Sequence, residues 1–417
     1  MKKIISILLL FTFSLYSADA TIEVIKKVDR LPTISVEDAS TSYGEIKKKL
    51  FFKTLISDLN VLSLYNVERT YTQITFDSES VSLNNRKQDY VLRYQLRKDD
   101  NGLFNTDIKL FYNKSLVYQK SYRIKNDNYY IFLVHSIAFD INKYMGNSDV
   151  DWIKKKIVLS RLVGANKSEI LITDYTLSYS KVILKGGMNI FPKWANTKQS
   201  VIYYTSLDGK RPTLFKLNTR TGNREKLLSS DGMLICSDVS SDGKKLLLTM
   251  APSGQPDIYV YDVVTKKYSR LTKYSGIDVN AQFMSNNRVV FISNRLGYPN
   301  VFSKKIGSNA VEQMVYYGKS NSACSAYKDY VVYKSRESNN AFSRNTFNLH
   351  LISTKTDFIR RLTATGENEF PRFSEDGGTI LFIKNYKSQS SIGVIRLETN
   401  KNFLFPLKIG KIQSIDW

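Results

Sequence analysis

The sequence contains few of the residues that usually carry enzyme or metal chemistry. Among its 417 residues there are only two cysteines and two histidines, and neither an HExxH motif nor paired cysteine ligands occur. A zinc site is therefore not expected, and we interpret His135 and His350 as packing or hydrogen-bonded residues. The nearest approach to a nucleophile elbow, at residues 318–322, lacks its second glycine. The sequence thus predicts a protein with no catalytic residues, no metal ligands and no cofactor.

Long apolar runs are also missing, apart from residues 4–13 near the start of the chain. That run follows Lys2-Lys3 and precedes Ala18-Asp19-Ala20, an A-x-A cleavage site, and this order is typical of a signal peptide over residues 1–20. Its length of about ten residues is too short to span a bilayer, and no cysteine follows that would mark a lipoprotein. We therefore expect cleavage after Ala20 and an exported protein that does not span the membrane.

Acidic residues are scarce relative to basic ones, because 38 Asp and Glu stand against 61 Lys and Arg, a net charge of +23. Residues 21–153 carry 19 basic and 17 acidic residues, whereas residues 154–417 carry 40 and 20. Such a charge attracts acidic partners. An exported chain rarely meets nucleic acid, so no nucleic-acid partner is predicted. Acidic protein surfaces, anionic glycans or lipid headgroups fit better, and a merely solvated lysine-rich surface is the alternative.

A four-stranded unit, Cys236–Thr272, recurs along the second part of the chain. Its first turn, Ser240-Ser241-Asp242-Gly243, has typical turn chemistry, and one such sheet cannot bury two faces alone. The residue before this turn, here called the anchor, recurs at intervals of 45, 44, 44, 46 and 44 residues. A period of about 40–45 residues with four strands per unit is typical of a β-propeller, and an evenly spaced sandwich is the alternative. The anchors are Trp194, Val239, Phe283, Tyr327, Phe373 and Trp417.

The two ends of the repeat region complement each other. The last anchor, Trp417, leaves its unit with an inner strand alone, while residues 157–187 supply three strands that lack an inner strand. Joined, they make one composite blade and remove the exposed sheet edges. The sequence therefore predicts a six-bladed propeller over residues 155–417, closed by the C-terminal strand. Cys236 and Cys324 lie two blades apart at equivalent positions, too far apart for a disulfide, so we expect free, buried thiols.

The sequence before the propeller predicts a small α/β domain over residues 34–150. A helix is expected over residues 40–60, with Ser40, Thr41 or Ser42 as its N-cap. A second helix is expected at Asn128–Tyr144, capped by Asp127 and ended by Gly146. Residues 21–33 precede any periodic pattern and are either a first edge strand or a flexible tail. The apolar stripe of the first helix is Ile46, Leu50, Leu55, Ile56 and Leu59. The expected strands are Asp89–Arg97, Phe104–Tyr112 and Leu116–Ile124.

The repeat VSSDGKKLLLTMAPSGQPDIYVYD and its copy FISNRLGYPNVFSKK resemble the repeats of the TolB family of the Tol-Pal system. Three upstream segments also follow the order of strands, second helix and first blade in that family: DYVLRYQLRKDDNGLFNTDIKLFYNKSLVYQKSYRI, HSIAFDINKYMG and KKIVLSRLVGANKSEILITDYT. The resemblance covers nearly the whole mature chain. It implies a periplasmic, non-enzymatic interaction protein, expected to be a monomer, that supports outer-membrane integrity and constriction at cell division.

The resemblance also implies partners. Family members bind the peptidoglycan-associated lipoprotein Pal through one face of the propeller and the C-terminal domain of TolA through the N-terminal segment, with other outer-membrane proteins as further partners. The residues expected to contact Pal lie in loops that precede the inner strands: Asp231, Gly232, Met233, Ser275, Asp278, Val279, Asn280, Asn321, Glu367 and Asn368. Those expected to contact TolA are Thr21, Ile22, Glu23, Val24, Ile25 and Lys26.

A protein of another class is the alternative hypothesis. A propeller enzyme or lectin that acts on or binds anionic envelope polysaccharide would need a polar central funnel rich in carboxylates, because paired carboxylates carry out glycoside hydrolysis. The two hypotheses therefore differ in what they expect of the residues around the propeller centre.

Overall fold

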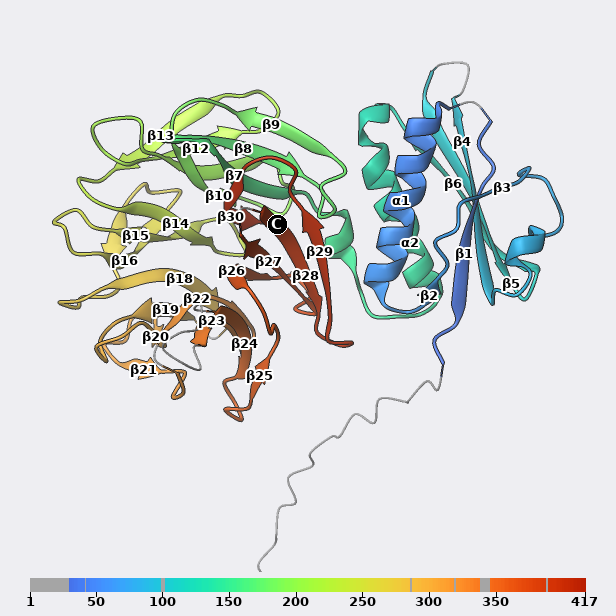
Figure 1. Ribbon diagram of the computed structural model, residues 1–417. Coiled ribbons are helices and arrows are strands. Elements are labelled where there is room, and N and C mark those ends of the chain that lie inside the picture. The colour runs from blue at the N-terminus through green and yellow to red at the C-terminus, as the bar shows by residue number, and fades with distance from the viewer. Residues whose placement is uncertain are drawn as a thin grey trace, which may run out of the picture. The chain divides into compact units, whose positions relative to one another are not determined.

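The computed structural model describes residues 30–41, 43–98, 102–285, 287–318, 320–337, 346–387 and 389–417. The predicted signal peptide and the predicted contact residues Thr21–Lys26 lie outside these ranges. Residues Pro32–Trp417 form one compact unit, in which an α/β domain is followed by a β-propeller (Figure 1). Within the described ranges, no helix is both long enough and apolar enough to cross a membrane.

The α/β domain is built on one mixed sheet with the strand order β2-β1-β4-β5-β6, in which β3 also pairs with β1. Strand β1 runs parallel to β2, β3 and β4, whereas β4, β5 and β6 are antiparallel. The sequence analysis did not predict β1, because TISVED is short and no turn signal marks its start. The strands are β1 (Thr33–Asp38), β2 (Asn66–Val67), β3 (Thr72–Gln73), β4 (Tyr90–Lys98), β5 (Phe104–Tyr112) and β6 (Ser115–Ile124).

Two helices, α1 (Glu45–Leu62) and α2 (Tyr130–Tyr144), pack side by side on one face of this sheet (Figure 1). The predicted N-cap of α1 is wrong, since Gly44 holds that position. The Ser40 hydroxyl instead accepts a hydrogen bond from the Leu96 amide at 2.9 Å, so Ser40 belongs to the sheet. Ile46 was placed in the apolar stripe but is 87% exposed. The short 3-10 helices are η1 (Leu83–Asn85), η2 (Asp127–Tyr129) and η3 (Asp151–Lys154).

The second helix begins later than predicted. Asp127 lies in η2 rather than at the N-cap, and Tyr129 precedes the first residue of α2 without a side-chain cap. The predicted end is correct, because Gly146 follows the helix with a φ of 70°, a backbone conformation that glycine adopts without strain.

The propeller consists of antiparallel sheets whose inner strands gather around a common centre, with β13, β16, β21 and β25 farther out (Figure 1). The first sheets are β10 (Asn189–Trp194), β11 (Val201–Ser206), β12 (Thr213–Asn218) and β13 (Arg224–Ser229); β14 (Leu234–Val239), β15 (Lys245–Met250), β16 (Asp257–Asp262) and β17 (Tyr268–Arg270); and β18 (Asp278–Met284), β19 (Arg288–Ser293), β20 (Asn300–Lys305) and β21 (Val311–Gln313).

The remaining strands include one sheet made from both ends of the propeller region. Strand β30 (Lys411–Asp416) pairs antiparallel with β7 (Ile157–Gly164), which continues to β8 (Lys167–Thr173) and β9 (Ser180–Leu184). A larger sheet joins two four-stranded groups through the single parallel pair Phe347–Glu367. Its strands are β22 (Asn321–Tyr327), β23 (Tyr330–Glu337), β24 (Thr346–Ser353), β25 (Ile359–Arg361), β26 (Glu367–Phe373), β27 (Thr379–Tyr386), β28 (Gln389–Arg396) and β29 (Lys401–Pro406).

A buried ionic network links the α/β domain to the propeller. His135 of α2 lies with its Nδ1 2.9 Å from Asp58 Oδ2 of α1 and its Nε2 3.3 Å from Asp174 Oδ2, just after β8. The Tyr175 hydroxyl donates to Asp58 Oδ1 at 2.5 Å. All four residues are buried, within an apolar core that runs from both helices into β7, β8, β27 and β28. Since a buried charge is tolerated only when paired, these partners hold the two domains in a fixed register.

The protonation states of this network follow from burial and charge. Burial alone would lower the pKa of His135, but the Asp58 and Asp174 carboxylates outweigh it and raise that pKa to about 10. Burial also acts to raise the pKa of Asp174, but hydrogen bonds and charge from His135 hold that pKa below its usual value. His135 is therefore an imidazolium at neutral pH and donates from both ring nitrogens.

Replacing His135 by Gln should destabilise the protein, because Asp58 and Asp174 would remain buried without a cation. We expect the free energy of unfolding at pH 7 to fall by about 3 kcal/mol, measured by urea denaturation. The stabilisation from a raised pKa is complete below the unfolded-state value of 6.5 and is lost as the pH rises through about 10. The stability difference between wild type and His135→Gln should therefore shrink between those two pH values.

The matched control is His350→Gln in β24. Burial lowers the pKa of His350, so its contact with Glu337 at 3.1 Å involves a neutral ring at pH 7. This change should cost about 1 kcal/mol or less. Equal losses for the two variants would contradict the network's role.

Candidate functional site

The inner strands of the propeller carry a bulge near the centre, where the pairing register shifts in β10, β14, β18, β22, β26 and β30. Four residues at these bulges have φ angles near 50°, a region that costs non-glycine residues about 1–3 kcal/mol each. They are Phe191, Asn280, Ala323 and Phe370. Bulges redirect side chains, and here all four residues line one cavity at the propeller centre.

That cavity, which we call the loop mouth, has a volume of about 310 Å³ and is lined mostly by strand residues, with Met233 from the loop before β14. Met233, Val279 and Asn280, all predicted contact residues, line it. Met233 is 44% exposed, so an apolar side chain is presented to solvent beside a hollow. An exposed apolar side chain next to a cavity is a common centre of a protein interface.

Other predicted contact residues lie around this mouth with different roles. Asp231 and Ser275 are exposed, and Asp231 pairs with Arg211 at 2.6 Å. Gly232 packs so closely on β15 that a Cβ there would collide with the Ala251 carbonyl oxygen, so its glycine is explained by packing. Glu367 is half-buried at the start of β26.

Three of the predicted contact residues are fully buried: Asp278, Asn321 and Asn368. Asp278 pairs with Arg295 through contacts of 3.0 and 3.1 Å. The Asn321 amide donates to the Tyr317 carbonyl at 2.8 Å, and the Asn368 amide donates to the Phe347 carbonyl at 2.8 Å. These side chains hold the loops in shape and do not present themselves to a partner.

Sequence reasoning missed several residues of the loop mouth, above all Phe191 and Phe370, whose ring centroids lie 6.2 Å apart. A signal for them existed. Each lies three residues before an anchor, as do Cys236, Asn280 and Ser414, which also line the cavity. Lys334 and Glu369 complete the wall with an ion pair of 2.7 Å.

The two cysteines are buried free thiols, as expected. Burial raises the pKa of Cys324 to about 12 and that of Cys236 well above its usual range. Both side chains are therefore protonated at neutral pH and behave as small packing groups.

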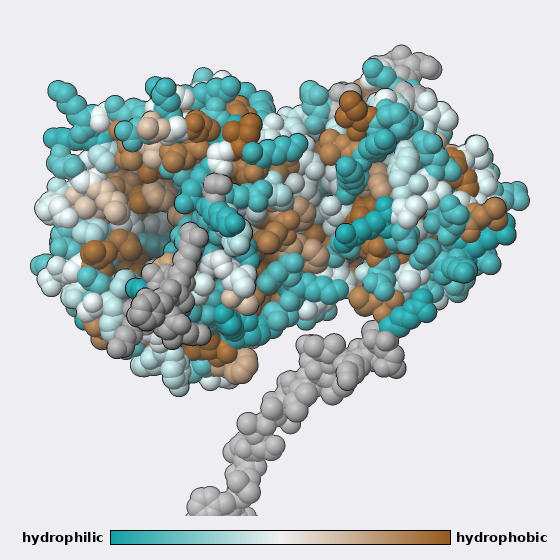
Figure 2. Space-filling model, in the orientation of Figure 1, coloured by the Kyte–Doolittle hydropathy of each residue, from teal (hydrophilic) through white to brown (hydrophobic). Residues whose placement is uncertain are grey.

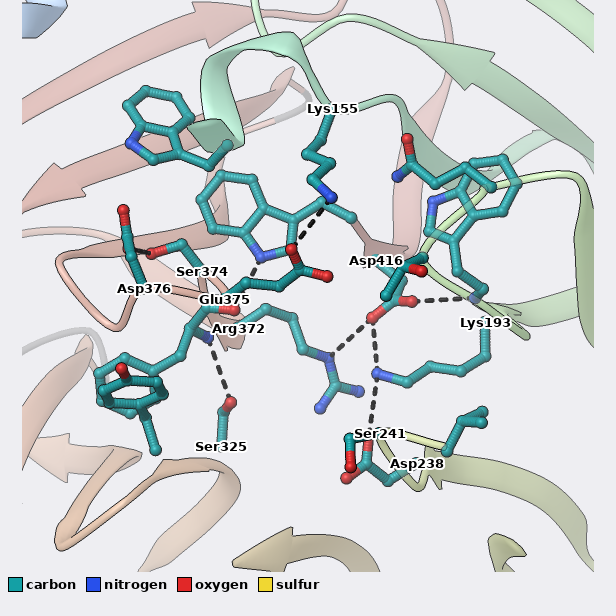
Figure 3. A pocket seen from close by; sticks show the side chains of 18 of the residues that line it. Lys155, Lys193, Asp238, Ser241, Ser325, Arg372, Ser374, Glu375, Asp376 and Asp416 are labelled. Carbon is teal, nitrogen blue, oxygen red and sulfur yellow. Dashed lines mark hydrogen bonds and ion pairs between the residues drawn. The ribbon is translucent and has the colours of Figure 1, made fainter. Parts of the chain in front are cut away.

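A second cavity of about 480 Å³, here called the anchor mouth, lies where the inner strands end (Figure 3). Five of the six anchors line it: Trp194, Val239, Tyr327, Phe373 and Trp417. The residues just before the six anchors all line it as well: Lys193, Asp238, Gln282, Ala326, Arg372 and Asp416. Because Lys193 and Arg372 also line the loop mouth, the two cavities meet at these side chains.

Side chains of this ring tie β30 to β10 and β14 to β18. Asp416 Oδ2 accepts the Trp194 amide at 2.9 Å, and Asp238 Oδ2 accepts the Phe283 amide at 2.8 Å. Lys193 Nζ lies 2.5 Å from Asp416 and 3.5 Å from Asp238, so one ammonium contacts both carboxylates (Figure 3). Buried backbone amides are almost always paired, and here the acceptor comes from a neighbouring sheet.

The outer surface of the propeller is hydrophilic over most of the face drawn in Figure 2, where brown apolar residues form separate patches among teal ones. Single exposed apolar residues on such a surface are ordinary. A further cavity of about 640 Å³ lies between α1 and β29, away from the propeller centre.

Comparison with known proteins identifies the family. A model of the "TolB beta propeller domain" matches residues 153–417. The "Tol-Pal system protein TolB" of Wolinella succinogenes is 47% identical over 414 residues, covering 97% of each chain. The chain belongs to the TolB family. Similar relatives of the same name occur in Campylobacter jejuni, at 45% identity over the full length of both chains, and in Helicobacter hepaticus, at 40% identity over 99% of each.

A solved structure supports the fold. The crystal structure of TolB from Acinetobacter baumannii is similar with a TM-score of 0.74, covering 93% of this chain and 98% of that one. The identity is 18%, so this likeness concerns the fold alone. It extends over both the α/β domain and the propeller, as the TolB-family resemblance led us to expect.

The free energies of unfolding of two variants distinguish the role of Asp278 from that of Met233. Asp278→Asn would leave Arg295 without its carboxylate and should lower the free energy of unfolding by about 3 kcal/mol. Met233→Ala, a change at a side chain that is 44% exposed, should alter it by less than about 0.5 kcal/mol. Urea denaturation of both variants measures the difference. Similar values would show that Asp278 does not hold its loop as described.

Proposed function

We propose that this protein is a non-enzymatic component of a Tol-Pal-like complex in the periplasm, bridging the peptidoglycan-associated lipoprotein Pal and the C-terminal domain of TolA. The observation that carries this proposal is the full-length similarity to proteins named "Tol-Pal system protein TolB" at 40–47% identity. The predicted signal peptide is consistent with export. Support for outer-membrane integrity and constriction at division follows from the same family membership.

We assign Pal to the loop mouth. Its favourable features are the exposed Met233, the neighbouring Val279 and the hollow between Phe191 and Phe370. Strained backbone is commonly retained where it shapes a binding surface, and Asn280, Ala323 and Phe370 carry positive φ angles around this hollow. The buried Asp278, Asn321 and Asn368 would act indirectly by holding the loops, and TolA would bind within residues 21–31.

We further infer a six-bladed propeller closed by its C-terminal strand. The pairing of β30 with β7 supports closure, and the single residue pair between β24 and β26 supports counting the large sheet as two blades. A closed ring holds the loops of the loop mouth in fixed relative positions, which favours a rigid binding surface.

An interaction role also accounts for the residues that chemistry would otherwise use. Both histidines contact carboxylates, His135 within a buried interdomain network and His350 beside Glu337. Within the part of the chain that the structure describes, no cluster of three or more His, Cys, Asp or Glu has the arrangement of a metal site. The carboxylates Asp238 and Asp416 at the propeller centre accept backbone amides, which assigns them a structural task.

Changing Met233 to Glu together with Val279 to Ala should weaken binding of purified Pal at least about tenfold, because a charge would replace the apolar side chain of Met233. The matched control is Val264→Glu, a residue that is 75% exposed in the turn between β16 and β17. That variant should bind like wild type. Isothermal titration calorimetry measures both, and unchanged affinity of the double variant would remove Pal from the loop mouth.

Deleting residues 21–31 should abolish binding of the TolA C-terminal domain and leave Pal binding intact or stronger. Fixing the backbone of a bound segment costs roughly 1–2 kcal/mol per residue, which suits a weak and switchable contact. Pull-down with each purified partner, using full-length mature and truncated protein, measures the two interactions separately. Loss of both interactions would argue against separate sites.

A further inference from the structure

The anchor mouth contains an arginine, Arg372, whose Nε has no hydrogen-bond acceptor among the described residues. The Arg372 side chain is 11% exposed, and its nearest carboxylate oxygen, Asp416 Oδ1, lies 3.8 Å from Nε. Nε is buried without a hydrogen-bond acceptor. Figure 3 shows the guanidinium projecting into the cavity, with a single dashed line leading to Asp416. A buried donor left unpaired costs about 1–3 kcal/mol, so this group is poised to bind an acceptor.

None of the other ring residues accepts a hydrogen bond from Arg372 Nε. Asp416 already holds Lys193 and the Trp194 amide, and Asp238 holds the Phe283 amide. Gln282 donates its side-chain amide to the Ser237 carbonyl at 2.7 Å, and the side chain of Ala326 has no polar atom. Lys193 therefore lies close to two carboxylates, whereas Arg372 lies 3.8 Å from Asp416 and its Nε has no acceptor among the described residues.

Ser325 places a second donor near Arg372. Its Oγ accepts the amide of Phe373, the residue after Arg372, at 3.2 Å (Figure 3). The hydroxyl hydrogen of Ser325 has no acceptor among the described residues, and its side chain lines the cavity. A guanidinium together with a hydroxyl donor is a suitable arrangement for a carboxylate, which accepts several hydrogen bonds.

The rim of the anchor mouth has the opposite charge. Asp149, Asp151, Glu375 and Asp376 line the cavity, where Asp151 pairs with Lys154 at 2.6 Å and Glu375 pairs with Lys155 at 3.0 Å. Glu375 and Asp151 are 64% and 45% exposed at their side chains. The rim therefore favours a cationic group of a ligand, and Arg372 at the centre favours an anionic group.

The walls between rim and centre are aromatic. Tyr327 and Phe373 lie with ring centroids 5.9 Å apart, and Trp152 and Trp417 lie 5.6 Å apart. Such faces pack well on the aliphatic part of a ligand. A volume of about 480 Å³ is within the range of about 300–1,000 Å³ that small-molecule sites occupy.

We propose that the anchor mouth binds a short zwitterionic peptide, with its terminal carboxylate on Arg372 and the Ser325 hydroxyl and its terminal ammonium at the acidic rim. The guanidinium at the centre and the carboxylates at the rim favour a zwitterion over a simple anion. Arg372 also lines the loop mouth, but the site includes none of the contact residues assigned to Pal or TolA and does not depend on the proposed function.

Tryptophan fluorescence provides a direct test, because the chain has only three tryptophans and all of them line this cavity: Trp152, Trp194 and Trp417. Titration with trialanine should change the emission with a saturable profile. Trialanine amide, which lacks the carboxylate, and N-acetyl-trialanine, which lacks the ammonium, should each bind at least about tenfold more weakly. Equal binding of the three probes, or no saturable response to trialanine up to about 1 mM, would overturn the proposal.

Arg372→Gln should lose the response to trialanine, whereas Arg220→Gln, at an exposed turn residue between β12 and β13, should keep it. Near-ultraviolet circular dichroism shows whether Arg372→Gln remains folded. If it does not, the comparison of trialanine with its amide on the wild-type protein decides alone. Inorganic phosphate or glucuronate giving a response as strong as that of trialanine would assign the cavity to anions in general and overturn the peptide assignment.

Discussion

The inner strands of the propeller depend on hydrogen-bond acceptors from their neighbours. Each bulge interrupts the ladder between an inner strand and its own sheet, which leaves amides near the centre that water reaches poorly. Asp416 and Asp238 accept from Trp194 and Phe283 of the next sheet, and Ser325 of β22 accepts from Phe373 of β26 within the large sheet. The same contacts therefore join neighbouring sheets, shape the bulges and determine which side chains face the centre.

The contact between the two domains follows the same rule at a larger scale. Asp58 and Asp174 come from different domains, and burial would make either carboxylate costly alone. His135 carries the charge that both require, with contacts of 2.9 and 3.3 Å. The surrounding core is continuous from α1 and α2 into the propeller strands. An apolar contact alone would permit sliding, whereas directional hydrogen bonds to one imidazolium define a single register.

Much of the fold could be predicted from the sequence because repetition and turn chemistry are local signals. The anchor spacing located the inner strands, and β5 has its predicted bounds. Failures occurred where a distant partner decided the outcome. Ser40 resembles an N-cap but bonds to Leu96, and Asp278 resembles an exposed loop residue but is buried against Arg295. Nothing in the local sequence reveals such partners, whereas Phe191 and Phe370 shared a repeat position that could have revealed them.

The choice of acceptor at each bulge also explains why the centre is electrically uneven. Where the acceptor is a carboxylate, as at Asp238 and Asp416, a cation must accompany it, and Lys193 lies within 3.5 Å of both. Where the acceptor is the neutral Ser325, no compensating charge is required, yet Arg372 stands beside it. The Arg372 guanidinium and the two carboxylates, Asp238 and Asp416, therefore lie in different sheets for different structural reasons. The consequence is a guanidinium that lies 3.8 Å from Asp416 and whose Nε has no acceptor among the described residues. It makes this side of the ring chemically distinct from the side around Lys193.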